Sequence, residues 1–476
     1  MTTISLSGGR VRGTSVDGID RYLGVPYAAA PTGDLRFAMP APHPGWSGER
    51  DATELGATAP QAPYRGAIGT LLPTVIIEGD DYLNVNVWAP TGASGLPVMV
   101  WVHGGSFAHG SNALPGYDGT PFARDGVVFV AVNYRLGMEG FPVLSGAPLN
   151  LGIADVQAAL RWVQSEIAKF GGDPKQVTVF GQSAGSILLG AIVAHPTASD
   201  LFARAILMSG APGALPVRQA AKISQLVARR LSIPATRESF AAVPAAELVA
   251  AADAIMAGGT PITGGPAFGP AVGGELVPQD PLKAILSGAG NDIALLIGST
   301  SEEYRLWFVP SGLMDTITPV LFTAARLKFG IGRRILHPYR ANRPGASRGV
   351  IFGALATDII LRLPINKVAD ARLKSGATTH VYEFTWPSPM LELGAAHAIE
   401  LGFVFDGLAE SDWTGLVGHD APQQLANDMH DAWIRFAKTG DPGWESWDAR
   451  RPVQTFDAPK SAIVYAPRED ERDGWR

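Results

Sequence analysis

The chain of 476 residues contains no cysteine. This absence excludes disulfides, a thiolate nucleophile and a cysteine-ligated metal. Charged residues are also scarce, at 17% of the chain with a net charge of -6, and the two signs are interspersed. We therefore expect neither a nucleic-acid partner nor binding to an anionic membrane surface.

Long apolar runs are missing as well. No window approaches about 18 consecutive apolar residues, which argues against a membrane-spanning helix. Residues 1–9 lack the basic stretch followed by an apolar stretch that is typical of a secretory signal. We expect a cytoplasmic location on these grounds.

The chain does contain enough apolar residues, 46% of the total, to bury a large core. Apolar runs of strand length alternate with amphipathic stretches of helix length, which predicts an α/β fold with a mostly parallel sheet covered by helices on both faces. Within residues 150–170, apolar side chains recur every three or four positions, as on a helix with one buried stripe. The predicted core strands are 97–102, 126–132, 177–180, 205–208, 293–297 and 380–384.

Two stretches fit the sheet less well, approximately residues 211–290 and 309–376. The first is rich in Ala, Gly and Pro, with helical patterns at 220–231 and 241–256. We interpret both as cap insertions over the active site within a single domain of residues 1–476. Residues 404 and 405 form an apolar run too short to assign.

A serine lies at the apex of a predicted strand, turn and helix. Residues 181–185 read GQSAG, after the apolar run 177–180 and before an Ala- and Leu-rich stretch that ends near His195. Glycines two positions on either side of Ser183 let strand and helix pack around a strained turn that exposes the hydroxyl. The pattern alone occurs by chance in many chains, but this context favours a nucleophile.

A serine nucleophile needs a base, and the base needs an orienting acid. Glu302 and Glu303 both follow the predicted strand 293–297, at the sheet edge where ligands bind in such folds. Spacing alone does not decide which of these two glutamates orients the base. Five histidines follow them in the chain, at positions 337, 380, 397, 419 and 430.

Among these histidines, the local sequence favours His397. It lies in a loop of small residues, where it should reach beyond the sheet. His380 begins a predicted strand and His430 lies on a polar helix face, so structural roles explain both better.

The loop after strand 97–102 is suited to bind an oxyanion. Residues 103–107 read HGGSF, and glycines there let backbone N–H groups approach a substrate oxygen. The amide of Ala184 adds a donor at the start of the next helix. A plain glycine turn capped by His103 is the simpler alternative. His103 precedes the serine in the chain and does not fit the order expected of the base.

Several longer segments match one known family. They include YLGVPY at 22–27, DDYLNVNVW at 80–88, NYRLG at 133–137 and FGGDPKQVTVFGQSAG at 170–185. Through these segments the chain resembles the type B carboxylesterases, the esterase and cholinesterase branch of the α/β-hydrolases, over nearly its whole length. The resemblance implies the α/β-hydrolase fold.

The resemblance also implies a choice between the open alternatives. The family's acid lies five residues after a strand-terminal glycine, and from Gly298 this position is Glu303. The family's base lies in a loop similar to residues 394–405, which implies His397 as the base and Glu400 as a nearby structural carboxylate. Glu302 then occupies the neighbouring acidic position.

The oxyanion donors implied by the resemblance are the backbone amides of Gly105, Ser106 and Ala184. The implied activity is hydrolysis of small to medium carboxylic esters through an acyl-enzyme on Ser183, with no metal and no organic cofactor. Hydrolysis of carbamates or activated amides by the same residues is an alternative. A non-catalytic binding module on the same fold is another, which the presence of all three triad residues disfavours.

Four positions depart from the family pattern. Tyr82 replaces a cysteine, Ser106 the third glycine of the oxyanion loop, Ser186 a glycine after the serine turn, and Tyr304 a glycine after the acid. Residues 57–79 contain no tryptophan, so the aromatic platform that cholinesterases use for quaternary ammonium is not expected here.

Trp307 and Phe308, just after the acid, are candidates for pocket walls. Ordinary core packing is an equally good explanation for this aromatic pair.

Overall fold

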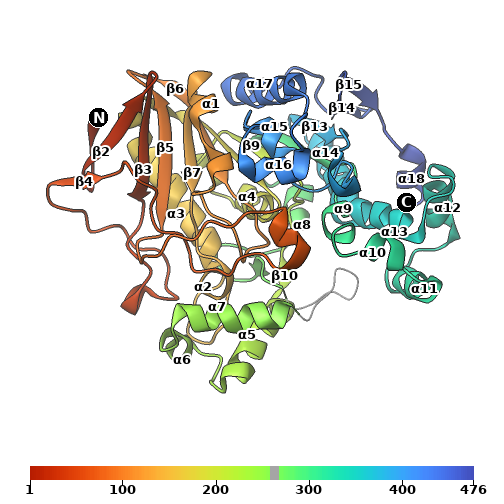
Figure 1. Cartoon of the computed structure of the whole chain (residues 1–476), viewed down its shortest axis with the longest axis horizontal. Coiled ribbons are helices and arrows are strands. Elements are labelled where there is room, and N and C mark those ends of the chain that lie inside the picture. The colour runs from red at the N-terminus through yellow and green to blue at the C-terminus, as the bar shows by residue number, and fades with distance from the viewer. Residues whose placement is uncertain (258–266) are drawn as a thin grey trace.

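A sheet of 13 strands crosses the centre of the computed structural model, which describes residues 1–257 and 267–476 (Figure 1). The strand order is β1-β2-β3-β5-β7-β6-β8-β9-β12-β13-β14-β15, and β4 pairs with β2. The strands of this sheet are β1 (Thr2–Leu6), β2 (Gly9–Val16), β3 (Ile19–Pro26), β4 (Glu49–Asp51), β5 (Asn84–Pro90), β6 (Leu96–Val102), β7 (Val128–Val132), β8 (Gly172–Gln182), β9 (Arg204–Met208), β12 (Ala294–Thr300), β13 (Thr379–Phe384), β14 (Pro452–Phe456) and β15 (Ala462–Tyr465). A separate parallel pair joins β10 (Leu215–Pro216) and β11 (Ala271–Val272).

Helices fill the connections between the strands. They are α1 (Thr120–Arg124), α2 (Gly137–Gly140), α3 (Leu151–Glu166), α4 (Ala184–Val193), α5 (Val217–Leu231), α6 (Arg237–Ala241), α7 (Ala245–Met256), α8 (Pro281–Leu286), α9 (Arg305–Phe308), α10 (Leu313–Thr316), α11 (Pro319–Lys328), α12 (Arg333–Ala341), α13 (Arg348–Thr357), α14 (Leu363–Lys374), α15 (Leu401–Val404), α16 (Ser411–Val417), α17 (Gln423–Thr439) and α18 (Glu469–Asp473).

The middle of the sheet is parallel and is buried on both faces. Seven neighbouring strands, from β7 to β14 in the sheet order, pair in parallel. On β6, Val98 and Val100 belong to the same apolar core cluster as Leu160 of α3. Trp101 points to the opposite face and packs in a second cluster with Trp433 of α17. This arrangement confirms the predicted mostly parallel sheet with helices on both faces.

All six predicted core strands are present, with shifted ends. The run at 177–180 is the second half of β8, which starts at Gly172, and the run at 293–297 extends to Thr300 in β12. Residues 404 and 405 lie at the end of α15. The predicted helix at 150–170 is α3 followed by a short 3-10 turn over Ile167–Phe170.

An antiparallel extension on the amino-terminal side of the sheet was not predicted. β1, β2, β3 and β5 pair antiparallel in sequence, and β5 joins the parallel centre by pairing antiparallel with β7. β2 reads GRVRGTSV and is buried only at Val11 and Gly13. Strands with one wet face lack the continuous apolar run on which the prediction depended.

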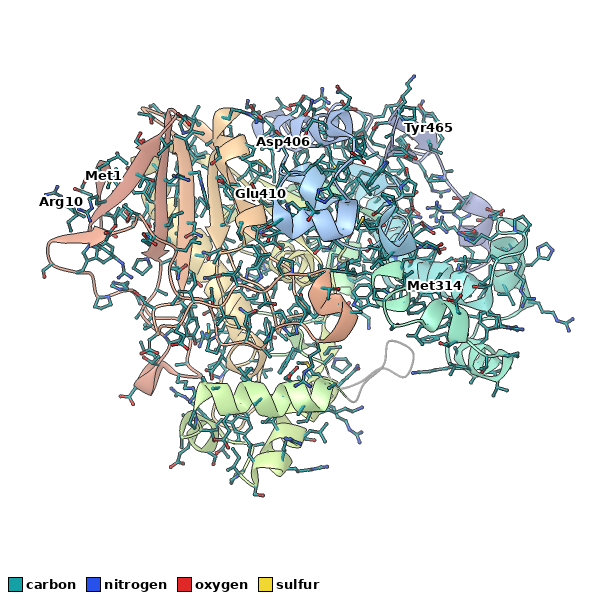
Figure 2. All side chains as sticks on the ribbon, viewed as in Figure 1. Met1, Arg10, Met314, Asp406, Glu410 and Tyr465 are labelled. Atoms are coloured by element: carbon teal, nitrogen blue, oxygen red, sulfur yellow. The ribbon has the colours of Figure 1, made fainter. Side chains whose placement is uncertain are left out.

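The two stretches predicted as insertions are mainly helical. The first contains α5 to α8, and residues 258–266 within it lie outside the described residues. The second contains α10 to α14. Its helices α10 to α13 form a small core with the preceding α9, around Phe308, Phe352 and Tyr339. Figure 2 shows Met314 of α10 in this group, on the opposite side of the molecule from Met1 and Arg10. Their role as a cap stays a prediction.

One helical run in the described part of the chain, Arg348–Lys374, is long and apolar enough on average to cross a bilayer. It was missed because the sequence criterion required consecutive apolar residues, whereas this run contains scattered charges. Of the apolar 18-residue window within this run, 56% is buried in the protein. Its π-helical turn Asp358–Arg362 contributes a buried ion pair between Asp358 and Arg362, and Arg362 also pairs with Glu471 of α18 at 2.9 Å. This is the pattern of a core helix.

Candidate active site

The serine turn has the predicted geometry. Ser183 joins β8 to α4 with φ 56° and ψ -120°, a conformation that is costly for a residue other than glycine. A Cβ on Gly185 would lie 2.0 Å from the carbonyl oxygen of Val102, and one on Gly181 would lie 2.8 Å from the backbone of Gly185. Only glycines therefore allow strand and helix to come this close, and Ser183 is left partly exposed at the apex.

A buried carboxylate and an imidazole meet beside this turn. The Nδ1 atom of His397 lies 2.5 Å from Oε2 of Glu303. The other oxygen of Glu303 accepts a hydrogen bond from the backbone N–H of Thr300 at 2.8 Å, which fixes the carboxylate. Both side chains are buried, at 8% and 1% exposure. Glu303 is therefore positioned to orient His397.

The neighbouring glutamate lies elsewhere. The side chain of Glu302 is 40% exposed and lies 3.3 Å from Arg305. It also accepts the backbone N–H of Ala395 at 3.1 Å. Adjacent residues after β12 point in different directions, so Glu302 supports the loop that carries His397 and does not contact the imidazole.

Burial and charge act in opposite directions on His397. Burial lowers the pKa of its imidazole, while the negative charge and hydrogen bond of Glu303 raise that pKa. The net pKa is above the ordinary histidine value. The charge of Glu303 thus favours the protonated form of His397 over the neutral form.

The other histidines are not placed to act as the base. His337 and His419 are exposed. His380 is buried beside Trp444 and Phe436, and His430 bonds the carbonyl of Val404 at 2.7 Å. These contacts agree with the structural roles predicted for His380 and His430.

His103 is likewise excluded. Its Nδ1 atom lies 2.8 Å from the carbonyl oxygen of Gly104, and its ring stacks on Tyr134 with centroids 4.5 Å apart. Burial lowers the pKa of His103 to about 4. The histidine shapes the loop and stays neutral.

Three backbone donors near Ser183 have no protein partner. Among the hydrogen bonds of the described residues, none uses the amide N–H of Gly105, Ser106 or Ala184. Gly105 and Ser106 have φ of 112° and 55°, so the loop turns through the left-handed region. A Cβ on Gly104 would lie 3.2 Å from Cβ of Ser183, which shows how closely the loop approaches the serine. Unpaired donors grouped in this way suit a developing oxyanion.

Ser183 and His397 line one cavity of about 230 Å³. Its walls are mostly apolar and aromatic, and they include Tyr64, Tyr117, Trp307, Leu401 and Trp413. Two larger surface hollows, of about 380 and 610 Å³, share no residue with it. The aromatic walls at positions 64, 117 and 413 were not predicted, because they come from segments far apart in the sequence, and Trp413 lies on α16.

Trp307 and Phe308 were candidates for pocket walls or for core residues, and the structure gives each a different place. Trp307 lines the cavity and lies against the ring of His397, with centroids 4.8 Å apart. Phe308 is fully buried and stacks on Phe352 of α13. The first is a pocket wall and the second is core.

Two further polar residues adjoin the site. The side chain of Gln182 lies with its Nε2 atom 3.0 Å from Nε2 of His397. Glu400 is buried and accepts a hydrogen bond from the hydroxyl of Ser209 at 3.2 Å. Burial and the charge of Glu303 raise the pKa of Glu400 well above its usual range. Gln182 stood within the serine motif but its contact was not predictable, because the distance in sequence to His397 is 215 residues.

Three of the four positions that depart from the family pattern have defined surroundings in the structure. The hydroxyl of Ser186 donates to the carbonyl of Gly210 at 2.6 Å. Tyr304 packs its ring edge-on against Phe308, and burial raises the pKa of Tyr304 to about 12. Tyr82 is buried in the core.

Metal ligands do not gather at the site. Within residues 1–257 and 267–476, no group of three or more His, Asp or Glu side chains is placed to hold a metal ion.

Comparison with known proteins decides the family. The model of the Carboxylesterase family matches residues 1–457. The chain belongs to this family. It is 37% identical to the para-nitrobenzyl esterase of Bacillus subtilis (strain 168), covering 93% of this chain and 91% of that protein.

Other esterases and hydrolases are also similar to this carboxylesterase. The phenmedipham hydrolase of Pseudarthrobacter oxydans is 34% identical, over 91% of this chain and 89% of its own. The fumonisin B1 esterase of Sphingopyxis macrogoltabida is 33% identical, over 94% and 85%. Among solved structures, the carboxylesterase of Geobacillus stearothermophilus has a TM-score of 0.89 and 33% identity with full coverage of both chains. A PNB esterase has a TM-score of 0.87 and 33% identity over 99% of each chain.

These matches confirm the predicted α/β-hydrolase fold and the predicted hydrolysis of carboxylic esters. The protein is a serine carboxylesterase that hydrolyses small-molecule esters. They favour an enzyme over the alternative of a non-catalytic module.

Proposed function

We propose that Ser183, His397 and Glu303 form the catalytic triad of this carboxylesterase. The observation that carries the proposal is the buried hydrogen bond of 2.5 Å between Glu303 and His397, at the wall of the same cavity as Ser183. A carboxylate that only accepts keeps the proton on Nδ1, which leaves Nε2 of the imidazole free to act as a base.

The backbone amides of Gly105, Ser106 and Ala184 form the oxyanion hole in this proposal. Two lie on the loop after β6 and the third at the first residue of α4. Their lack of protein acceptors supports this role, since a donor already paired would have to break a bond during the reaction. Ser106 lines the cavity, and its side chain leaves the backbone amide available.

The reaction then proceeds in two steps. Ser183 attacks the ester carbonyl while its hydroxyl proton passes to Nε2 of His397, and the oxyanion is held by the three amides. The imidazolium returns this proton to the leaving alcohol as the C–O bond breaks. Water gives a proton to His397 and attacks the acyl-enzyme. The imidazolium then returns that proton to Oγ of Ser183 as the acyl bond breaks, which releases the acid and restores the enzyme. These steps need neither a metal nor an organic cofactor.

Small to medium esters with an apolar part suit this site. The cavity of about 230 Å³ is lined largely by aromatic and aliphatic side chains. We expect p-nitrophenyl esters of short acyl chains to be hydrolysed best, with kcat/KM falling once the acyl chain outgrows the cavity. Rates that rise steadily up to long acyl chains would contradict this size limit.

A burst experiment tests the mechanism itself. Rapid mixing of the enzyme with p-nitrophenyl acetate should release one p-nitrophenol per active site before the steady state. Absence of a burst, with no acyl adduct on Ser183 after acid quenching under single-turnover conditions, would contradict the acyl-enzyme. A matched carbamate measured beside the ester distinguishes the alternative substrate class, because faster carbamate turnover would reverse the assignment.

We also propose that the enzyme works in the cytoplasm without a nucleic-acid or membrane partner. Its freedom from cysteine, with Tyr82 at a position where relatives place a disulfide cysteine, suits a reducing compartment. Fractionation of the cells that produce it, followed by an ester assay of each fraction, tests the location.

A further inference from the structure

The nitrogen of His397 that has to receive the serine proton is already engaged in the structure. Nε2 of His397 lies 3.0 Å from the side-chain Nε2 of Gln182. Within the described residues, no hydrogen bond joins His397 to the hydroxyl of Ser183. The base therefore faces Gln182 when no substrate is bound.

The direction of this hydrogen bond follows from the other side of the ring. The carboxylate of Glu303 can only accept, so the imidazole proton sits on Nδ1 and a lone pair sits on Nε2. The Gln182 amide must then donate an N–H to that lone pair. Gln182 thus selects the tautomer that the base needs, while it occupies the atom that the base uses.

The side chain of Gln182 has little room to move away from His397. It is the last residue of β8, directly before Ser183, and only 3% exposed. A Cβ on Gly104 would lie 2.9 Å from its Oε1 atom, so the amide is enclosed between the oxyanion loop and the imidazole. An ester that enters the oxyanion loop arrives beside this amide.

We propose that Gln182 is a positioning residue that holds Nε2 of His397 in the substrate-free enzyme and yields it to the Ser183 hydroxyl when an ester binds. This inference rests on the proposed triad. Its first consequence is a modest brake on acylation, because one neutral hydrogen bond has to be exchanged for another. A bond of this kind corresponds to a rate factor of about 2 to 10.

The second consequence concerns charge. Two carboxylates already act on His397, those of Glu303 and Glu400, while Trp307 covers the ring without a charge. A third carboxylate at position 182 would accept a hydrogen bond from the protonated Nε2 and would stabilise the imidazolium. A neutral amide bonds the same atom and leaves it unprotonated, so it keeps the base available at lower pH.

Two variants of Gln182 test the proposal, with acylation measured by rapid mixing with p-nitrophenyl acetate between about pH 5 and about pH 9. Gln182→Met keeps the length of the side chain and removes the donor. We expect this variant to be acylated about 2 to 10 times faster. The pH at which its acylation rate falls on the acid side should stay unchanged. Gln182→Glu should raise that pH by about 1 to 3 units, with activity recovering at high pH.

Equal or slower acylation of Gln182→Met, or no such rise in Gln182→Glu, would overturn the proposal. Gln176→Met is the matched control, because Gln176 lies on the same strand and bonds Asp173 at 2.9 Å, away from the site. It should acylate like the original enzyme. Ser183→Ala separates the two levels of failure: if it retains activity, the triad fails, whereas an inactive Ser183→Ala beside unaltered Gln182 variants overturns the role of Gln182 alone.

Discussion

Replacing Glu303 with glutamine should remove most of the activity with little loss of fold. The carboxylate donates no proton and accepts from both Thr300 and His397, whereas an amide can present an N–H to Nδ1. His397 would then place its proton on Nε2, which is the wrong tautomer for a base.

The size of the effect follows from the bond that is lost. A hydrogen bond to a charged group contributes about 1.5 to 3 kcal/mol, which alone corresponds to a rate factor of about 10 to 150. The wrong tautomer adds to this, and the same change of acid to amide in another serine-hydrolase triad costs about 10⁴ in kcat. We therefore expect Glu303→Gln to lower kcat by about 10² to 10⁴.

Glu302→Gln is the matched control for this change. Its side chain is 40% exposed and bonds only Arg305 and the backbone of Ala395, so we expect a change in kcat below about threefold. Both variants are assayed with p-nitrophenyl acetate at saturating concentration and checked by thermal unfolding. A larger loss in Glu302→Gln, or equal losses in both, would refute the assignment of the acid.

The remaining predictions concern pH and the aromatic pair. His397 must be neutral to accept a proton, and its pKa is raised. We therefore expect kcat/KM to fall as the pH drops through a midpoint above about 6.5. A midpoint well below that value would contradict the raised pKa of His397. Phe308→Ala should destabilise the protein by about 3 to 5 kcal/mol in urea unfolding, because the ring is fully buried and stacked on Phe352. Trp307→Ala should unfold close to the original midpoint and should lower kcat/KM about 2- to 10-fold, because the ring contact with His397 is lost. A variant that is unstable yet fully active would show instead that Trp307 is a core residue.

The parallel half of the fold was predictable because its strands are buried on both faces. Such strands read as continuous apolar runs, as in β7, where all five residues are buried. β2 and β3 mix buried and half-exposed positions, and charged residues interrupt both, so neither reads as a continuous apolar run. The helices of the second insertion have a small core of their own, which no local pattern reveals.

The site was predictable where chemistry is local in sequence. The close backbone approach at the serine turn requires glycine on either side of Ser183, and these glycines are part of the sequence motif. The choice between Glu303 and Glu302 was not local, because spacing left both open and only the family resemblance favoured Glu303. In the structure the side chain of Glu303 contacts His397, whereas that of Glu302 contacts Arg305. The Arg135 of the NYRLG segment has a structural role, a fully buried ion pair with Asp155 at 2.7 Å.

The contact between Gln182 and His397 lay beyond any sequence pattern. It joins residues 215 positions apart through the packing of the loop that carries His397 onto the end of β8. Such distant pairings depend on the register of whole elements, and motif spacing does not encode them.

Covalent labelling can identify the nucleophile of this enzyme. A fluorophosphonate probe should modify one residue per chain, and peptide mass spectrometry should place the adduct on Ser183. Ser183→Ala should bind no probe and lose at least about 10³ in kcat while unfolding at the original midpoint. An adduct on another residue, or turnover by Ser183→Ala at the original rate, would show that Ser183 is not the nucleophile.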